Sequence, residues 1–308
     1  MDTERLSPRY SGIDTWDPSD VLDAMIDGQF SAVAAVRAAR GAIERAALAV
    51  EAQLRDGGRL VYAGAGTSGR LAVQDGAELM PTFSWPNDRL LLFIAGGDAA
   101  LLRAKEGAED ELGHAVDLVR RNGISQNDAL IAVAASGTTP FTLACLREAK
   151  ARGALTVGIA NNPGTPILEE AECPICLETG PEPIAGSTRM NAGTAQRIAL
   201  SLISTLVMIR LGKVYAGLMV DVQASNAKLV DRREKMVHHL TGGTSDEVRD
   251  ALAQAQGSVK LAVLLLKGCD LEEAERVLDR AGGQLRAALA VVAEDRGNAS
   301  PLQPGQAR

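Results

Sequence analysis

The chain has 308 residues, of which 46% are hydrophobic and 23% are charged, and its formal net charge is −7. This is the composition of a globular protein with room for one large domain and a small one, or for two medium ones. Acidic residues are in excess, no dense Lys/Arg run occurs, and only 3% of the residues are aromatic. We therefore expect no nucleic-acid partner, because neither the phosphate backbone nor the bases would find a binding surface.

The amino-terminal segment lacks the apolar run of a signal peptide, and apolar stretches such as residues 199–211 look too short and interrupted to span a bilayer. We therefore predict a cytoplasmic protein with no membrane partner. Four cysteines are too few for a disulfide framework in a chain of this length. Cys173 and Cys176 have the spacing of a redox motif, but no second Cys or His pair lies nearby, so we predict structural thiols and no metal.

The predicted elements begin with a helix over residues 19–54, with Ser19 as its N-cap and apolar residues at steps of three and four. Short apolar runs then alternate with helical stretches. These runs cover residues 59–63, 90–95, 129–134, 155–160 and 173–177. The alternation predicts a doubly wound parallel sheet with helices on both faces, which is a three-layer αβα arrangement.

The composition changes near His239, where Leu240-Thr241-Gly242-Gly243 follows. Beyond that point the spacing predicts a small module of short amphipathic helices over residues 244–256, 258–267, 271–281 and 284–293. We therefore expect four parts. They are an amino-terminal arm and helix (1–54), an α/β catalytic domain (55–239), a small helical domain (240–296) and a disordered tail (297–308).

The loop after the first apolar run contains Gly64, Gly66 and Gly69, which formally match the G-x-G-x-x-G pattern of dinucleotide sites. That interpretation requires an acidic residue at the end of the next strand, about 20 residues further on. The first such residue, Asp98, lies more than 30 residues past Gly64. The dinucleotide interpretation is therefore the weaker one.

A phosphate monoester fits these loops better, because it presents three oxygens that several short donors can meet. Thr67 and Ser68 combine hydroxyls with the free N–H groups of a helix N-terminus, and a second loop repeats the arrangement before Pro140. The predicted phosphate contacts are Gly66, Thr67, Ser68, Ser136, Gly137, Thr138 and Thr139. Taken singly, each loop could also be a simple N-cap or turn; their recurrence on parallel strands favours a site.

Over residues 3–289 the chain resembles the N-acetylmuramic acid 6-phosphate etherases of the sugar isomerase (SIS) domain superfamily. The glycine loop indicates only the superfamily, whereas the glutamate segments and the MVDVxxxNxKL stretch are more specific. The matching stretches are GRLVYAGAGTSGRLAVQDGAEL, AGGDAALLRAKEGAEDE, AASGTTPF, GIANNPGTP, AGSTRMNAGTAQ, GKVYAGLMVDVQASNAKLVDR and AGGQLRAAL.

The resemblance implies cleavage of a lactyl ether by elimination and then hydration, giving N-acetylglucosamine 6-phosphate and D-lactate in peptidoglycan amino-sugar recycling. It implies no cofactor, a homodimer and an SIS domain followed by a small helical domain. It assigns proton donation to Glu78, a second active-site carboxylate to Glu109, and substrate contacts to Lys228 and Ser187. Asn191 stands where the family often has Lys, which bears on phosphate binding or on the dimer contact.

Two carboxyl groups suit this chemistry if one is protonated while the other is ionised. We assign Glu109 as the base that removes the carbon-2 proton and Glu78 as the acid that protonates the departing oxygen. Two alternatives share the same loops. One is a sugar-phosphate isomerase, and the other is a non-catalytic sensor of sugar phosphates, for which both glutamates would be expendable.

Overall fold

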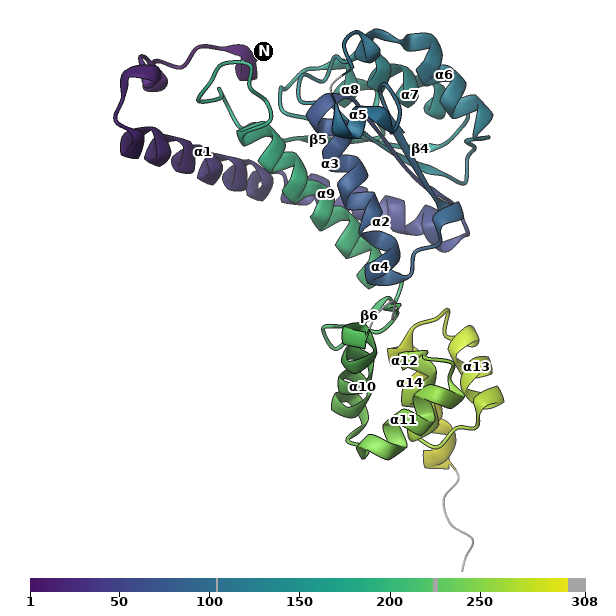
Figure 1. Cartoon of the computed structure of the whole chain (residues 1–308). Helices are drawn as coiled ribbons and strands as arrows, with labels where there is room; N and C mark the ends of the chain where they lie inside the picture. Colours follow the sequence, from purple (N-terminus) through teal and green to yellow (C-terminus); the bar gives the residue numbers. More distant parts are fainter. Residues whose placement is uncertain (104, 224–226, 299–308) are drawn as a thin grey trace, which may run out of the picture. The chain divides into compact units, whose positions relative to one another are not determined.

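The structure is a computed structural model that describes residues 1–103, 105–223 and 227–298 (Figure 1). The chain divides into two compact units. We call Met1–Met80 with Trp85–Val207 the sheet unit, and Pro81–Ser84 with the chain from Met208 onward the helical unit.

The sheet unit contains five parallel strands in the order β2-β1-β3-β4-β5. They are β1 (Leu60–Gly64), β2 (Leu90–Ile94), β3 (Ala129–Val133), β4 (Leu155–Ala160) and β5 (Cys173–Cys176). Every residue of β1, β3 and β4 is buried, as expected of parallel strands covered on both faces. The parallel sheet with flanking helices confirms the predicted fold class, and each strand lies within about one residue of its predicted run.

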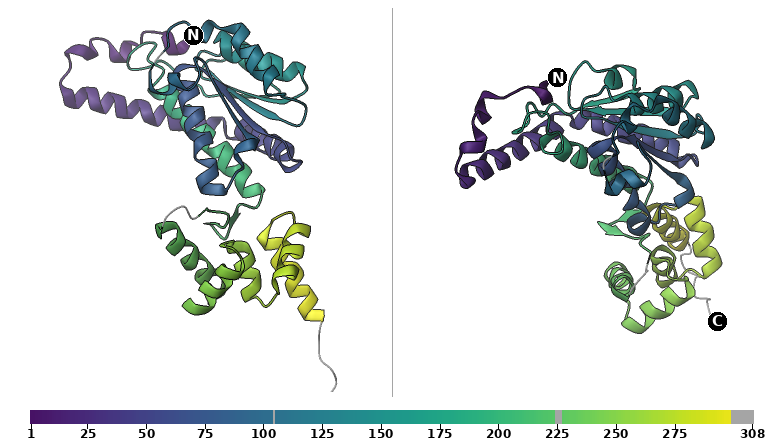
Figure 2. Two further views of the ribbon diagram at one scale, coloured as in Figure 1. Left: turned by 45° about the vertical axis from the view of Figure 1, so that its right-hand side comes forward. Right: turned by 45° about the horizontal axis from the view of Figure 1, so that its top comes forward.

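In the described residues, nine α-helices precede, separate or follow these strands along the chain. They are α1 (Pro18–Ala38), α2 (Arg40–Arg55), α3 (Gly66–Ala77), α4 (Leu79–Phe83), α5 (Ala99–Leu102), α6 (Leu112–Arg121), α7 (Pro140–Ala151), α8 (Pro166–Glu170) and α9 (Asn191–Arg210). Helices α6 and α7 pack on one face of the sheet, while α2, α3 and α9 lie together on the other (Figures 1 and 2). The result is the expected three-layer arrangement.

The predicted helix over residues 19–54 is two helices in the structure. The chain leaves helical geometry at Ala39, whose ψ is 1°, and Gly41, a weak helix former, follows the break. The N-cap is Asp17 rather than Ser19, because Pro18 occupies the first helical position, where its missing N–H and fixed φ are tolerated.

Helix α9 is the one described helix that is long and apolar enough, by length and composition, to cross a membrane. The helix is 20 residues long. The apolar stretch over residues 199–211 is thus part of a longer helix, and the expectation that it is too short to span a bilayer is corrected. More than half of its apolar window, 56%, is buried within the protein, and Ala195, Ala199 and Ile203 lie in the core. Its apolar composition is thus accounted for by packing.

The described part of the helical unit consists of a short hairpin, β6 (Val214–Tyr215) and β7 (Leu218–Met219), and five α-helices. These are α10 (Ala227–Thr241), α11 (Ser245–Gln254), α12 (Val259–Leu266), α13 (Leu271–Arg280) and α14 (Leu285–Asn298). Thr244, Ser258 and Asp270 each accept a backbone N–H and cap α11, α12 and α13. The four helices expected beyond residue 243 are therefore present.

The division between the units differs from the expected boundary after residue 239. Helix α10 belongs to the helical unit, because Met236 and Val237 are part of its core together with Val248 and Val263. Gly242 and Gly243 thus separate two helices of one unit rather than two domains. Of the tail predicted to be disordered, residues 297–298 end α14, and residues 299–308 lie outside the described residues.

Candidate functional site

The sheet order places two loops side by side at the carboxyl edge of the sheet. Strand β1 lies between β2 and β3, so the chain leaves β1 and β3 toward opposite faces of the sheet. Ligands of open parallel sheets collect at such a switch point, beyond the carboxyl ends of the strands. The loop after β1 and the loop after β3 are those in which phosphate contacts are predicted.

The glycine loop after β1 is shaped by a close approach of its own backbone. A Cβ on Gly64 would lie 2.8 Å from the Cα of Gly69, so only glycine lets the strand end pack against the first turn of α3. Helix α3 then starts at Gly66, and Thr67 and Ser68 follow in its first turn. The N–H groups of this turn have no partner within the helix and point beyond the strand.

The loop after β3 presents hydroxyls at the start of α7. The Oγ of Ser136 lies 3.3 Å from the Oγ1 of Thr139 and accepts the backbone N–H of Thr138 at 3.2 Å. Gly137 has a φ of +69°, and a Cβ there would lie 2.1 Å from the Oγ1 of Thr165. Any other residue would therefore displace the loop.

These two loops line one pocket of about 400 Å³, which is within the range of small-molecule sites. The structure thus brings together the predicted residues Gly66, Thr67, Ser68, Glu109, Ser136, Thr138 and Thr139. Gly137 supports the loop without lining the pocket, and Thr188 lines it in place of its neighbour Ser187.

The pocket wall carries acidic side chains and neutral donors. Among the described residues that line it, the ionisable ones are Glu4, Glu109 and Asp110. A phosphate in this pocket would therefore have to be held by hydroxyls, backbone N–H groups and the positive ends of α3 and α7 rather than by a cation. The structure brings together the Thr, Ser and Gly residues of the two helix starts, and phosphate binding by them stays a prediction.

Cations lie beside this pocket rather than in it. A neighbouring pocket of about 230 Å³ shares Ala65, Gly66 and Glu109 with it and is also lined by Arg70 and Lys105. The Nε of Arg70 donates to the carbonyl of Ala100 at 2.9 Å, which fixes the guanidinium there. Sequence reasoning missed these two residues as well as Glu4 and Thr188, because a single charge or hydroxyl in a loop carries no spacing signal.

Glu109 lies in a short 3-10 turn, Ala108–Asp110, that follows β2 and α5. Ala108 is 2% exposed and belongs to the core beneath α6 and α7, so it anchors the turn. The side chain of Glu109 is exposed at the rim that the two pockets share. It can therefore reach a ligand held by either loop.

Glu78 lies outside both pockets, at the far end of α3 from the glycine loop. It caps the carboxyl end of α3, a helix of 12 residues that begins at the glycine loop and is about 18 Å long. Its side chain is exposed, and it lines neither pocket. The structure thus does not bring the two predicted glutamates together within one chain.

A buried polar cluster holds the end of α3 that carries Glu78. The hydroxyl of Tyr62 donates to Asp75 at 2.8 Å, and Arg197 lies 3.5 Å from the same carboxylate. Burial raises the pKa of Asp75, although the bonds to Tyr62 and Ser204 and the charge of Arg197 oppose the shift. Burial also raises the pKa of Tyr62, so its phenol stays protonated as a donor.

Two further predicted positions fall outside the pocket. Lys228 is exposed in the first turn of α10, in the helical unit, so its role stays a prediction. Asn191 is 1% exposed, and its Oδ1 accepts a hydrogen bond from Gln29 of α1 at 3.2 Å. A Cβ on Gly28 would lie 2.6 Å from the same oxygen. In this chain Asn191 therefore packs α9 against α1 and does not line the pocket formed by the loops after β1 and β3.

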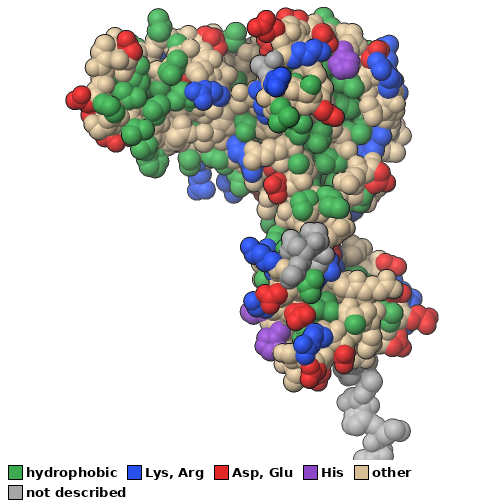
Figure 3. Space-filling view, viewed as in Figure 1, with side chains coloured by type: hydrophobic (Ala, Val, Ile, Leu, Met, Phe, Trp, Pro, Cys, Tyr) green, Lys and Arg blue, Asp and Glu red, His purple; other side chains and the backbone are tan. Residues whose placement is uncertain are grey.

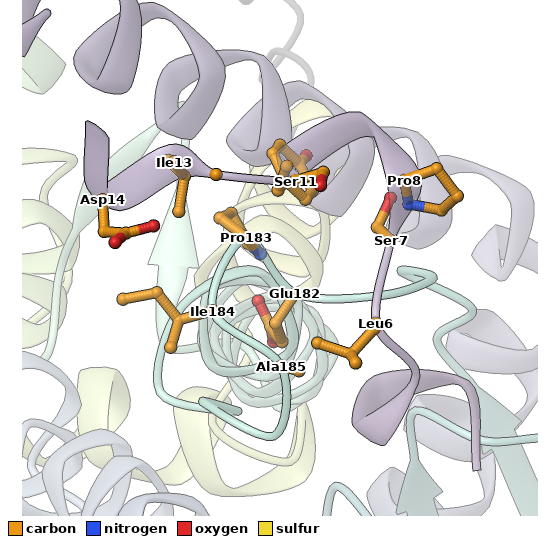
Figure 4. A pocket seen from close by; sticks show the side chains of 12 residues that line it. Leu6, Ser7, Pro8, Ser11, Ile13, Asp14, Glu182, Pro183, Ile184 and Ala185 are labelled. Atoms are coloured by element: carbon orange, nitrogen blue, oxygen red, sulfur yellow. The ribbon is translucent and has the colours of Figure 1, made fainter. Parts of the chain in front are cut away.

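A second, larger pocket of about 620 Å³ lies between residues 6–14 and residues 182–185 (Figure 4). Glu182, which lines this pocket, has a structural role. Its carboxylate accepts hydrogen bonds from the N–H groups of Asn191 and Ala192, at the start of α9, at 2.8 and 2.9 Å. Burial raises the pKa of Glu182, and these two bonds oppose the shift. None of the predicted site residues lines this pocket, so the pocket at the two loops is the candidate site.

None of the four cysteines, all of which lie in the described residues, forms a disulfide. Cys173 and Cys176 lie in β5 and are half-buried, and burial raises the pKa of both, that of Cys176 to about 11. Burial also raises the pKa of Cys145 to about 12. Redox and metal chemistry require a thiolate, so the raised pKa values of these three thiols favour the structural role predicted for them.

Comparison with known proteins points to one group of relatives. A family model for the glucokinase regulatory protein N-terminal SIS domain matches residues 42–150, and one for the SIS domain matches residues 111–206. The chain is 51% identical to a protein from Deinococcus radiodurans named N-acetylmuramic acid 6-phosphate etherase, over 93% of this chain and 94% of that protein. It is 41% identical to one of the same name from Mycolicibacterium smegmatis, over 94% and 97%.

Proposed function

The chain belongs to the N-acetylmuramic acid 6-phosphate etherase family, and from this premise we propose that it cleaves the D-lactyl ether of N-acetylmuramic acid 6-phosphate. The observation that carries the proposal is the pocket in which two hydroxyl-bearing helix starts face the carboxylate of Glu109. A phosphorylated amino sugar matches both features, since one end is an anion and the other carries the bond to be broken.

The phosphate fits between the two loops. Thr67 and Ser68 approach it from α3, and Ser136, Thr138 and Thr139 approach it from α7. With these donors fixed by the sheet, the sugar extends toward the rim, where Glu109 lies. Arg70 and Lys105, in the adjoining pocket, would meet the lactyl carboxylate.

The reaction we propose is an elimination followed by a hydration. In the open-chain sugar the aldehyde acidifies carbon 2, and the carboxylate of Glu109 takes the proton from that carbon. The bond between carbon 3 and the ether oxygen breaks, and the departing oxygen takes a proton from the carboxyl group of Glu78. Water then adds at carbon 3, and a proton returns to carbon 2, which yields N-acetylglucosamine 6-phosphate and D-lactate. The enzyme would be a carbon–oxygen lyase.

The distance between the glutamates leads to a second part of the proposal. Because α3 separates Glu78 from the pocket, we infer that the chain acts as a homodimer in which the partner subunit's Glu78 completes the site. Such a site would be symmetric, each copy lending one carboxylate to the other.

An apolar stripe on α1 supports association with a second copy. Leu22, Ile26, Phe30 and Val33 recur at steps of four, four and three, so they share one face of the helix. All four are more than half exposed, and hydrophobic side chains gather over this arm of the sheet unit (Figure 3). A stripe of this kind is typical of an interaction surface.

We place the reaction in the cytoplasm, within peptidoglycan amino-sugar recycling. Four cysteines without a disulfide among the described residues support a reducing compartment, where disulfides do not persist.

Product analysis in heavy-oxygen water tests the chemistry. The protein should convert N-acetylmuramic acid 6-phosphate to D-lactate and to N-acetylglucosamine 6-phosphate labelled at carbon 3. Lactate without the label would exclude elimination and hydration. Isomerised sugar without lactate would instead identify an isomerase. Sugar phosphate binding that is unaffected by loss of both glutamates, without turnover, would identify a sensor.

Mixing two inactive variants tests the shared site. Glu78→Gln and Glu109→Gln would each be inactive alone, whereas their mixed dimer would contain one site with both native glutamates. With random pairing the mixture should recover about a quarter of the native activity. If both carboxylates act from the same chain, the mixture stays inactive and the dimeric site is excluded.

A further inference from the structure

We propose that the helical unit carries a second anion site, which binds a phosphate dianion, either free or as a monoester. The site is a polar pocket of about 410 Å³ whose charged lining residues are Lys213, Asp221, Arg233 and Lys260. Every residue that lines it belongs to the helical unit, so it shares no residue with the pocket at the loops after β1 and β3. The proposal is independent of the chemistry assigned to that pocket.

Two ammonium groups converge on one carboxylate in this pocket. The Nζ of Lys260 lies 2.8 Å from the Oδ2 of Asp221, and the Nζ of Lys213 lies 3.0 Å from the same oxygen. Lys260 is 5% exposed and also donates to the carbonyl of Gly283 at 2.7 Å. Burial lowers the pKa of Lys260, Asp221 opposes the shift, and the nearby Lys213 adds to it. One positive charge is therefore left uncompensated.

Arg233 adds a second uncompensated charge. Its Nε and Nη2 both donate to the carbonyl of Val222, at 3.0 and 2.8 Å, and no carboxylate of the described residues pairs with it. Burial lowers its pKa, without an opposing acidic neighbour. A partly buried charge without a counter-ion is costly, so an anion that pairs with it would be bound favourably.

The backbone next to Arg233 contributes further donors. Gln256 and Gly257 both have positive φ, +50° and +81°, and turn the chain into Ser258, the N-cap of α12. The space beside Gly257 holds the Nη1 of Arg233, which a Cβ there would approach to 2.6 Å. Val259 and Lys260, the first two residues of α12, line this pocket, and their N–H groups precede that of Leu261, which donates to the Oγ of Ser258.

The charge balance selects the ligand class. Three cations and one carboxylate leave an excess of two positive charges, which a phosphate dianion would neutralise. A singly charged carboxylate such as lactate would leave one cation unpaired. Phosphate also offers several acceptor oxygens, which suits cations that approach from α10, from α12 and from the segment before β6.

Equilibrium dialysis of the full chain against inorganic phosphate tests the proposal. Arg233→Gln keeps an amide donor near Val222 and removes the charge, and Arg232→Gln is the matched control, since Arg232 is an exposed neighbour that does not line the pocket. We expect Arg233→Gln to bind one phosphate fewer per chain, or to bind that phosphate roughly tenfold more weakly, than Arg232→Gln. Equal binding by the two variants would overturn the proposal.

Hydrogen exchange on the native chain gives a test that does not depend on a variant folding. Inorganic phosphate should slow exchange of the backbone amides over residues 256–261, and D-lactate at the same concentration should not. Unchanged exchange with phosphate would overturn the site. Competition by glucose 6-phosphate at the Arg233-dependent site would identify a monoester as the ligand, and its failure to compete would identify free phosphate.

Discussion

The two units offer an anion different surroundings. The sheet unit presents hydroxyls and backbone N–H groups at the starts of α3 and α7, and the ionisable residues in that wall are acidic. The helical unit gathers Lys213, Arg233 and Lys260 around a single carboxylate. Neutral donors act only at contact distance and fix the orientation of a ligand, whereas net charge attracts from further away and is screened by salt. The first arrangement suits a site for chemistry, and the second suits a site for binding.

The largest effect should follow from removing the carboxylate that distinguishes the sheet unit. Glu109→Gln takes away the base that we propose, so lactate release should fall by about a thousandfold with little change in KM. Glu111→Gln, an exposed neighbour that does not line the pocket, should retain native turnover. Steady-state assays of released D-lactate measure both. Native turnover in Glu109→Gln would show that the reaction is not catalysed in this pocket.

A smaller effect should follow from distorting the loop after β3. Gly137→Ala places a Cβ against Thr165 at positive φ, and we expect a loss of about 2 kcal/mol in the free energy of unfolding together with a raised KM. Gly164→Ala is the control, because its φ is +63° and its Cβ would meet nothing within 4 Å. Urea unfolding and substrate titration compare the two. Equal losses would show that the contact with Thr165 is unimportant.

The comparison can be sharpened by varying salt. Ser136→Ala removes one hydroxyl from the sheet-unit pocket, so KM should rise roughly tenfold. The donors that meet the phosphate there are neutral, so added salt should change the ratio of the KM of Ser136→Ala to the native KM less than it weakens binding of the phosphate that we propose at Arg233. Titrations at low and high ionic strength report both quantities. The distinction between the units fails if the two respond alike.

The smallest effect concerns a residue of the sheet unit far from the pocket. Asp128 precedes the amino end of β3 and pairs with Arg59 at 2.8 Å. Burial raises the pKa of Asp128, but its hydrogen bonds with Arg59 and Ser125 outweigh burial, and the pKa is lowered from 3.8. Its stabilisation is therefore present above that pH and is lost as the pH falls below it.

Asp128→Asn should accordingly destabilise the protein by about 1 kcal/mol near neutral pH and flatten the acid limb of the stability curve. Turnover should stay native, since the pair lies at the opposite edge of the sheet from the pocket. Urea unfolding between pH 3 and pH 7 measures the difference. An unaltered acid limb would show that Asp128 does not contribute to it.

Much of the sheet unit could be predicted from the sequence, because its signals are local. Apolar runs closed by glycine mark β1 and β3, and Thr67, Ser68 and Ser136 follow them at positions where a helix begins. Pairing between neighbouring parallel strands then brings the two loops together.

The rest of the site depends on contacts between distant residues. Lys105, in a loop, and Glu4, at the end of a short 3-10 helix, reach the pockets by a chain path that no periodicity reveals. The separation of Glu78 from Glu109 results from the length and direction of α3, which the spacing of residues does not report. Likewise, α10 joined the helical unit because its apolar face packs there, although two glycines follow it.

The fit between Gly28 and Asn191 links two positions that are far apart in the sequence. A relative with a long side chain in place of Asn191 must direct it away from α1 or keep that helix at a greater distance. The two positions should therefore vary together among relatives. In the homodimer that we propose, α1 also carries the exposed apolar stripe, so the residues at these two positions would set the angle at which the two copies meet.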